Sequence, residues 1–120
     1  MSEPILVVDD DEIILQSIDA ILRDENYSVV VAANGKDALE QARLTPPALI
    51  LLDMKMPIMD GWTFATRYRQ EPPPHAPIVV MTAARDTKAR AAEIGADDFL
   101  IKPFNLEDLL AVVQRFVAPD

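Results

Sequence analysis

The fold is decided by the stretch Ala48-Leu49-Ile50-Leu51-Leu52-Asp53, in which an unbroken apolar run ends abruptly in an acid. Runs of this kind are typical of parallel strands that are buried on both faces. Three more apolar runs also end abruptly in a polar residue, namely residues 5–8 before Asp9 and Asp10, residues 78–81 before Thr82, and residues 99–101 before Lys102. The run 29–31 supplies a fifth strand, which we place at or near a sheet edge because no reactive group follows it.

Helical patterns separate these runs. Apolar residues recur at helical spacing over about residues 11–24 and, more weakly, after Asn34-Gly35. The pair Asp60-Gly61 predicts a turn that begins another helix, and Asn105 is a predicted N-cap of the last helix. Five strands that alternate with five helices predict an α/β fold with a doubly wound parallel sheet and right-handed connections.

The polar residues at the strand ends share one edge of such a sheet. Ligands bind in the crevice at the carboxyl ends of parallel strands, so Asp9, Asp10, Asp53, Thr82 and Lys102 are expected to form one site. Aspartate oxygens are suitable ligands for Mg²⁺. Three converging carboxylates would repel one another without a cation. The cluster therefore predicts a metal site.

The same residues also suit phosphoryl transfer. An aspartate can attack phosphorus, while a lysine and a hydroxyl can neutralise and bind the phosphoryl oxygens. Each residue has an ordinary interpretation as well. Asp9 or Asp10 alone would be a helix cap, Thr82 a strand former, and Lys102 a solvated charge. Their joint occurrence at four strand ends favours the functional interpretation.

With these residues in these positions, the chain resembles a known family, the receiver domains of two-component response regulators. The resemblance covers essentially the whole chain in order, and residues 1–120 are taken as a single receiver domain. It implies a flavodoxin-like fold with strand order 2-1-3-4-5. The motifs that carry it are Asp9-Asp10, Asp53-Met54-Lys55-Met56-Pro57-Ile58-Met59-Asp60-Gly61, Met81-Thr82-Ala83 and Lys102-Pro103-Phe104.

The resemblance also implies a metal site. Asp53 would be the phospho-acceptor, and Asp10 and Asp53 would bind Mg²⁺ directly, with Mn²⁺ as a substitute. Asp9 would act through a metal-bound water, and the backbone carbonyl of Lys55 would complete the protein ligands.

The remaining implied roles concern the phosphoryl group and its effect. Thr82 and Lys102 would hold the phosphoryl group, and Thr82 would move toward it while Phe99, at the aromatic switch position, turns inward. The donor would be a sensor histidine kinase or a histidine phosphotransfer protein, and an output protein or domain would bind the switched surface. The chain would thus be a signalling domain rather than an enzyme, with self-catalysed phosphotransfer and slow autodephosphorylation.

Composition agrees with a small acidic domain. The 120 residues have a formal net charge of -9, which argues against a nucleic-acid surface within this chain. Cysteine is absent, and the amino terminus lacks the features of a signal peptide. No apolar run approaches the length of a membrane span. We therefore expect a cytoplasmic protein that binds neither nucleic acid nor membrane, either as a stand-alone receiver or as an excised one.

Two other functions are less consistent with the sequence. A haloacid-dehalogenase-type phosphatase would need a second aspartate two residues after the nucleophile, where this chain has Lys55. A pseudo-receiver that acts only as a phosphorylation-independent interaction scaffold would normally have lost an acid, the hydroxyl or the lysine. None of these is missing, so the phospho-accepting function is favoured over both.

One segment departs from the family pattern. The stretch between Thr82 and Lys102 is slightly shorter than in typical receivers, with the deficit in residues 84–88. We expect a shortened loop before the fourth helix, or a shortened first turn of that helix, and hence signalling that depends less on this helix. Phosphorylation-induced NMR shifts that are largest in residues 86–94 would contradict this expectation.

Overall fold

The protein, as a computed structural model, is described here for residues 3–83 and 87–119. Its strands form one five-stranded sheet in the order β2-β1-β3-β4-β5, and every neighbouring pair is parallel. The predicted strand order and the edge position of the second strand are therefore confirmed. The strands are β1 (Ile5–Val8), β2 (Val29–Ala32), β3 (Leu49–Asp53), β4 (Ile78–Ala83) and β5 (Asp98–Lys102).

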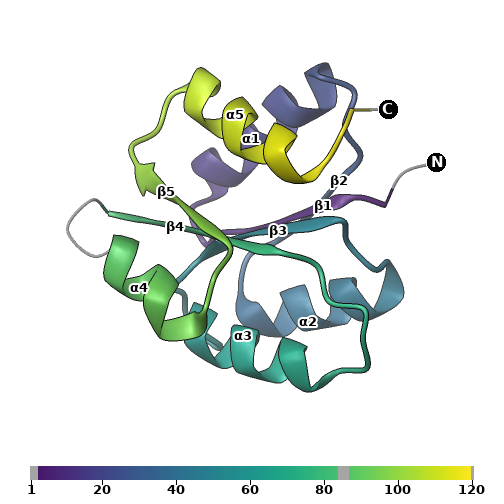
Figure 1. Ribbon diagram of the computed structural model, residues 1–120, viewed down its shortest axis with the longest axis vertical. Coiled ribbons are helices and arrows are strands. Elements are labelled where there is room, and N and C mark those ends of the chain that lie inside the picture. The colour runs from purple at the N-terminus through teal and green to yellow at the C-terminus, as the bar shows by residue number, and fades with distance from the viewer. Residues whose placement is uncertain (1–2, 84–86, 120) are drawn as a thin grey trace.

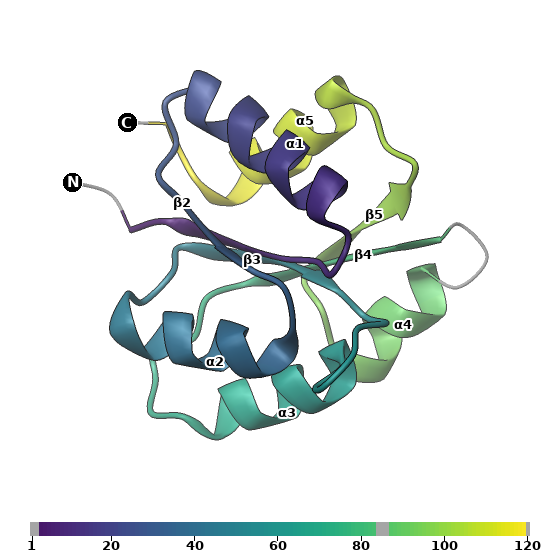
Figure 2. The same cartoon turned by 180° about the vertical axis from the view of Figure 1, so that it is seen from behind.

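Helices cover both faces of this sheet. Figure 1 shows α1 and α5 on one face and α2, α3 and α4 on the other, and the reverse view in Figure 2 shows the same two layers. The helices are α1 (Glu12–Asp24), α2 (Gly35–Leu44), α3 (Gly61–Gln70), α4 (Thr87–Ile94) and α5 (Leu106–Phe116). This is the doubly wound α/β arrangement that the alternating pattern predicts.

The position of β3 between the two helical layers explains why its sequence is apolar without interruption. Leu49 and Leu51 belong to the core cluster beneath α1 and α5, whereas Ile50 and Leu52 belong to the cluster against α2, α3 and α4. All four residues are fully buried. Because successive side chains of a strand point to opposite faces, a central strand between two helical layers requires apolar residues at every position.

Side-chain caps begin the helices where the sequence predicts them. Asp60 Oδ1 accepts a hydrogen bond from Thr63 N at 2.9 Å, and Asn105 Oδ1 accepts one from Asp108 N at 2.8 Å. The helix predicted from about residue 11 begins at Glu12, because Asp11 is itself the N-cap. These caps fix the helix starts next to the sheet edge that carries the polar residues.

Helix α4 has eight residues, the fewest of the five helices. The loop expected to be shortened falls on residues 84–86, which lie outside the described residues. Two residues of α3 contact the carboxyl end of α4: the Trp62 indole donates to Glu93 at 2.5 Å, and Arg69 donates to the carbonyls of Ile94 and Gly95.

Among the described helices, none has both the length and the apolar composition needed to cross a membrane.

Candidate functional site

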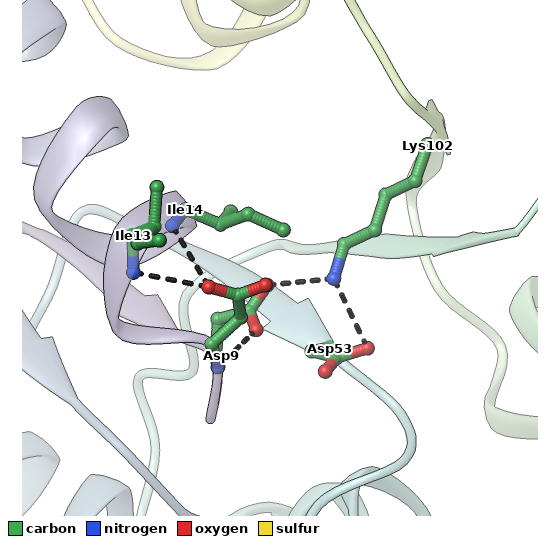
Figure 3. A network of polar contacts seen from close by, with 6 residues as sticks. Asp9, Ile13, Ile14, Asp53 and Lys102 are labelled. Atoms are coloured by element: carbon green, nitrogen blue, oxygen red, sulfur yellow. Dashed lines mark hydrogen bonds and ion pairs between the residues drawn. The ribbon is translucent and has the colours of Figure 1, made fainter.

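The carboxyl edge of the sheet brings the predicted polar residues together. Asp53 is the last residue of β3 and Lys102 the last of β5, while Thr82 lies near the end of β4 and Asp9 directly follows β1. Figure 3 shows Asp9, Asp53 and Lys102 directed toward one another. Parallel register produces this convergence, because all strands end at the same edge.

Lys102 is the positive centre of the site. Its Nζ lies 2.7 Å from Asp9 Oδ2 and 3.6 Å from Asp53 Oδ1 (Figure 3). Asp9 has no solvent exposure, and its Oδ1 accepts a hydrogen bond from the backbone N–H of Asp11 at 2.9 Å. A buried carboxylate requires such partners, and here the lysine and this amide supply them.

Three carboxylates form a cluster that fits a divalent cation. Asp9, Asp10 and Asp53 each offer one oxygen, and these oxygens lie within 4.8 Å of one another. Asp9 and Asp53 are buried, whereas Asp10 is exposed, so the cluster opens to solvent on one side. Hard oxygen donors with an open side suit Mg²⁺, which keeps part of its coordination for water and phosphate oxygens.

The electrostatics of this cluster act most strongly on Asp53. Burial and the nearby charges of Asp9 and Asp10 raise the pKa of its carboxyl, while the positive charge of Lys102 opposes them; together they place this pKa at about 6, above its usual value of 3.8. A bound divalent cation would reduce the repulsion between these carboxylates.

A match to a family model identifies the protein family in which this site occurs. The family model described as the response regulator receiver domain matches residues 5–114. The chain belongs to the response regulator receiver family. Receivers of this family are the signalling domains of two-component systems, in which they interact with histidine kinases and output domains.

Curated relatives and solved structures agree with this assignment. The receiver is 38% identical over 115 residues to the response regulator ArlR of Staphylococcus saprophyticus and 40% identical over 118 residues to the transcriptional regulatory protein PrrA of Mycobacterium leprae. These matches cover 94% and 97% of the receiver but only 51% and 50% of the relatives. The chain thus spans about half the length of the curated relatives it matches.

The chemotaxis response regulator CheY4 of Vibrio cholerae has a similar structure. It is 32% identical, with a TM-score of 0.84, and the match covers 98% of this receiver and all of that chain. The receiver domain of the Francisella response regulator 1452 is 28% identical, with a TM-score of 0.85 and 96% coverage of both chains.

The other predicted residues lie around this edge. Thr82 is buried in β4 beside β5, and Phe99 is half-buried in β5, where its side chain packs against the cluster beneath α2, α3 and α4. Lys55 is exposed in the loop between β3 and α3. The structure also shows that α2 contacts this loop, because Gly35 N donates to Met59 O at 2.9 Å. No local pattern in the sequence indicates this contact.

The raised pKa of Asp53 predicts how the stability of the metal-free receiver depends on pH. The folded state binds the carboxyl proton of Asp53 more tightly than the unfolded state does, so protonation of Asp53 stabilises the fold. This stabilisation is fully present below the pKa of the unfolded state and is lost as the pH rises through about 6. Between about pH 5 and about pH 7.5, the parent should lose roughly 1 kcal/mol of unfolding free energy relative to Asp53→Asn. Urea unfolding in EDTA measures this difference; an equal pH dependence of the two proteins would contradict it.

Proposed function

We propose that this receiver accepts a phosphoryl group on Asp53 from a phosphohistidine of a sensor histidine kinase or a histidine phosphotransfer protein. The observation that carries the proposal is that the buried carboxylate of Asp53 lies beside a lysine ammonium group, since Lys102 Nζ is 3.6 Å from Asp53 Oδ1. The whole of residues 1–120 would act as one phospho-accepting domain, located in the cytoplasm.

The transfer itself requires little beyond positioning and charge neutralisation. An Asp53 carboxylate oxygen would attack phosphorus while the bond from phosphorus to the imidazole nitrogen breaks, and its electron pair would return to the imidazole. Lys102 and the Thr82 hydroxyl would bind the phosphoryl oxygens. Hydrolysis of the resulting acyl phosphate by water would slowly restore the free carboxylate.

Four groups would hold Mg²⁺ in this reaction: the carboxylates of Asp10 and Asp53 directly, Asp9 through a water, and the backbone carbonyl of Lys55. The 4.8 Å cluster of carboxylate oxygens supports this arrangement. When bound, Mg²⁺ neutralises charge on the carboxylates and on the phosphoryl oxygens, and Mn²⁺ could replace it.

The added charge must then change the surface that a partner recognises. We propose a shift between two states in which Thr82 moves toward the phosphoryl group and Phe99 turns inward. The half-buried position of Phe99 leaves part of its side chain at the surface, so an inward turn would alter that surface. An output protein, or an output domain of a longer chain, would bind there.

Incubation with acetyl phosphate and Mg²⁺, followed by intact mass measurement, tests the acceptor role. We expect a single phosphoryl adduct on the parent receiver, since acetyl phosphate is a small acyl phosphate that needs no docking partner. Asp53→Asn and EDTA serve as controls, and both should abolish the adduct.

Two results would overturn the proposal. An adduct that persists in Asp53→Asn would place the phosphoryl group on another residue. A folded parent that forms no adduct would instead favour a pseudo-receiver acting only as an interaction scaffold. Circular dichroism of each sample confirms that the compared proteins are folded.

A further inference from the structure

The loop between β3 and α3 contains a strained turn. Ile58 has φ of 70°, a region that β-branched residues strongly disfavour. Around it, Met59 N donates to Pro57 O at 2.7 Å, which closes a three-residue turn of the rare γ type. Ile58 is 79% exposed, so burial of this residue does not explain the conformation.

Strained turns of this kind persist only where the surroundings hold them. The two ends of the loop are joined by the hydrogen bond from Gly61 N to Met54 O at 2.8 Å. The strained part is held from outside the loop by α2, because Gly35 N donates to Met59 O at 2.9 Å. The amino terminus of α2 therefore contacts the loop next to its strained residue.

This contact requires a glycine at position 35. A Cβ atom there would lie 2.7 Å from Met59 O and 2.8 Å from Met59 Cγ. The first of these is a backbone atom, which cannot rotate away as a side-chain end can. Any larger residue would therefore push the loop away from α2 and lengthen the hydrogen bond from Gly35.

The loop begins at the acceptor. Met54, the residue after Asp53, is fully buried, whereas Lys55 is exposed and Ile58 lies only three positions further along. If the strained turn relaxed, the backbone between Met54 and Ile58 would have to adjust, and the carbonyl of Lys55 would shift with it. A metal ligand supplied by backbone depends on how that backbone is held.

We propose that Gly35 is a positioning residue for the cation site: through Met59 it holds the β3–α3 loop in the strained conformation that presents the Lys55 carbonyl beside Asp53. This inference rests on the proposed metal-binding function. Gly35 itself touches neither the cation nor the phosphoryl group. Its effect passes through the loop backbone.

Mg²⁺ titration of the parent and of Gly35→Ala, followed by backbone amide NMR, tests the inference. We expect Gly35→Ala to bind Mg²⁺ about tenfold more weakly, with metal-free shift changes concentrated in residues 54–61. Gly95→Ala is the matched control. Gly95 also needs glycine, because its φ is 61°, but nothing lies within 4 Å of an added Cβ there. This control should lose stability while its Mg²⁺ affinity stays at the parent value.

A second pair of variants covers the case in which Gly35→Ala does not fold. Asn34 caps α2 by accepting the amide of Asp37 at 2.9 Å, so Asn34→Ala should loosen the same helix end and weaken Mg²⁺ binding. Asn34→Ser keeps a capping oxygen and should restore the affinity.

The outcomes separate the inference from the function on which it rests. Mg²⁺ affinity equal to the parent in Gly35→Ala, or in Asn34→Ala when Gly35→Ala is unfolded, would overturn the positioning role and leave the metal site intact. Equal losses of affinity in Gly35→Ala and Gly95→Ala would also overturn it, since the effect would then follow stability alone. A parent that binds no Mg²⁺ would overturn the proposed metal site and this inference together.

Discussion

Replacement of Lys102 by Met is expected to slow phosphorylation by acetyl phosphate by about a hundredfold. Lys102 Nζ is within 3.6 Å of the Asp53 carboxylate and would neutralise charge that develops on the phosphoryl oxygens. The same lysine opposes the rise in the pKa of Asp53, so its loss would also leave more of the acceptor protonated near neutral pH. Both effects reduce the rate.

The substitution has a second expected effect, on stability. Asp9 is completely buried and lies 2.7 Å from the Lys102 ammonium, so Lys102→Met leaves an uncompensated carboxylate. Breaking such a pair should lower the unfolding free energy of the metal-free receiver by about 3 kcal/mol. Mg²⁺ should recover much of this loss, because it supplies positive charge to the same carboxylates.

Lys36→Met is the matched control for this variant. Lys36 is exposed in the first turn of α2, and its replacement changes the net charge equally. Phosphorylation rates from intact mass, together with urea unfolding with and without Mg²⁺, give both quantities. If Lys102→Met and Lys36→Met were phosphorylated at the same rate, Lys102 would have no role in the transfer.

Phe64→Ala is expected to cost about 3 to 5 kcal/mol of unfolding free energy. Phe64 has no solvent exposure and belongs to the core cluster beneath α2, α3 and α4, where its ring stacks on Tyr68 with centroids 5.7 Å apart. Truncation leaves a cavity that the surrounding strands and helices cannot fill completely.

The loss matters for the site because Phe64 fixes α3 against the sheet. The first residue of this helix, Gly61, closes the loop that follows Asp53. Leu44→Ala is a suitable control: Leu44 is 77% exposed in α2, and its truncation should change stability by less than about 0.5 kcal/mol. Urea unfolding compares the two variants, and similar losses in both would mean that Phe64 does not organise this core.

The sequence predicted the fold because the deciding signals are local. An unbroken apolar run such as residues 49–52 already requires a strand buried on two faces, and caps such as Asn105 mark helix starts within a few residues. The family resemblance gave the strand order, which spacing alone does not determine. The length of the loop at residues 84–86 stays a prediction, since it lies outside the described residues.

Membership of the site was also predictable, since strand ends in a parallel sheet share an edge. Asp9, Asp53, Thr82 and Lys102 could be grouped from their positions alone. Their roles in metal binding and phosphoryl transfer remain proposals supported by this arrangement.

Only the tertiary structure decided how these groups interact. It shows that Lys102 lies nearer to Asp9 than to Asp53, that Asp53 is buried, which raises the pKa of its carboxyl, and that Gly35 donates a hydrogen bond to Met59 in the loop beyond the acceptor. Lys102 and Asp9 are 93 positions apart in the chain. The distance between such side chains, and their separation from water, depend on how strands and helices pack together, which no local pattern of residues records.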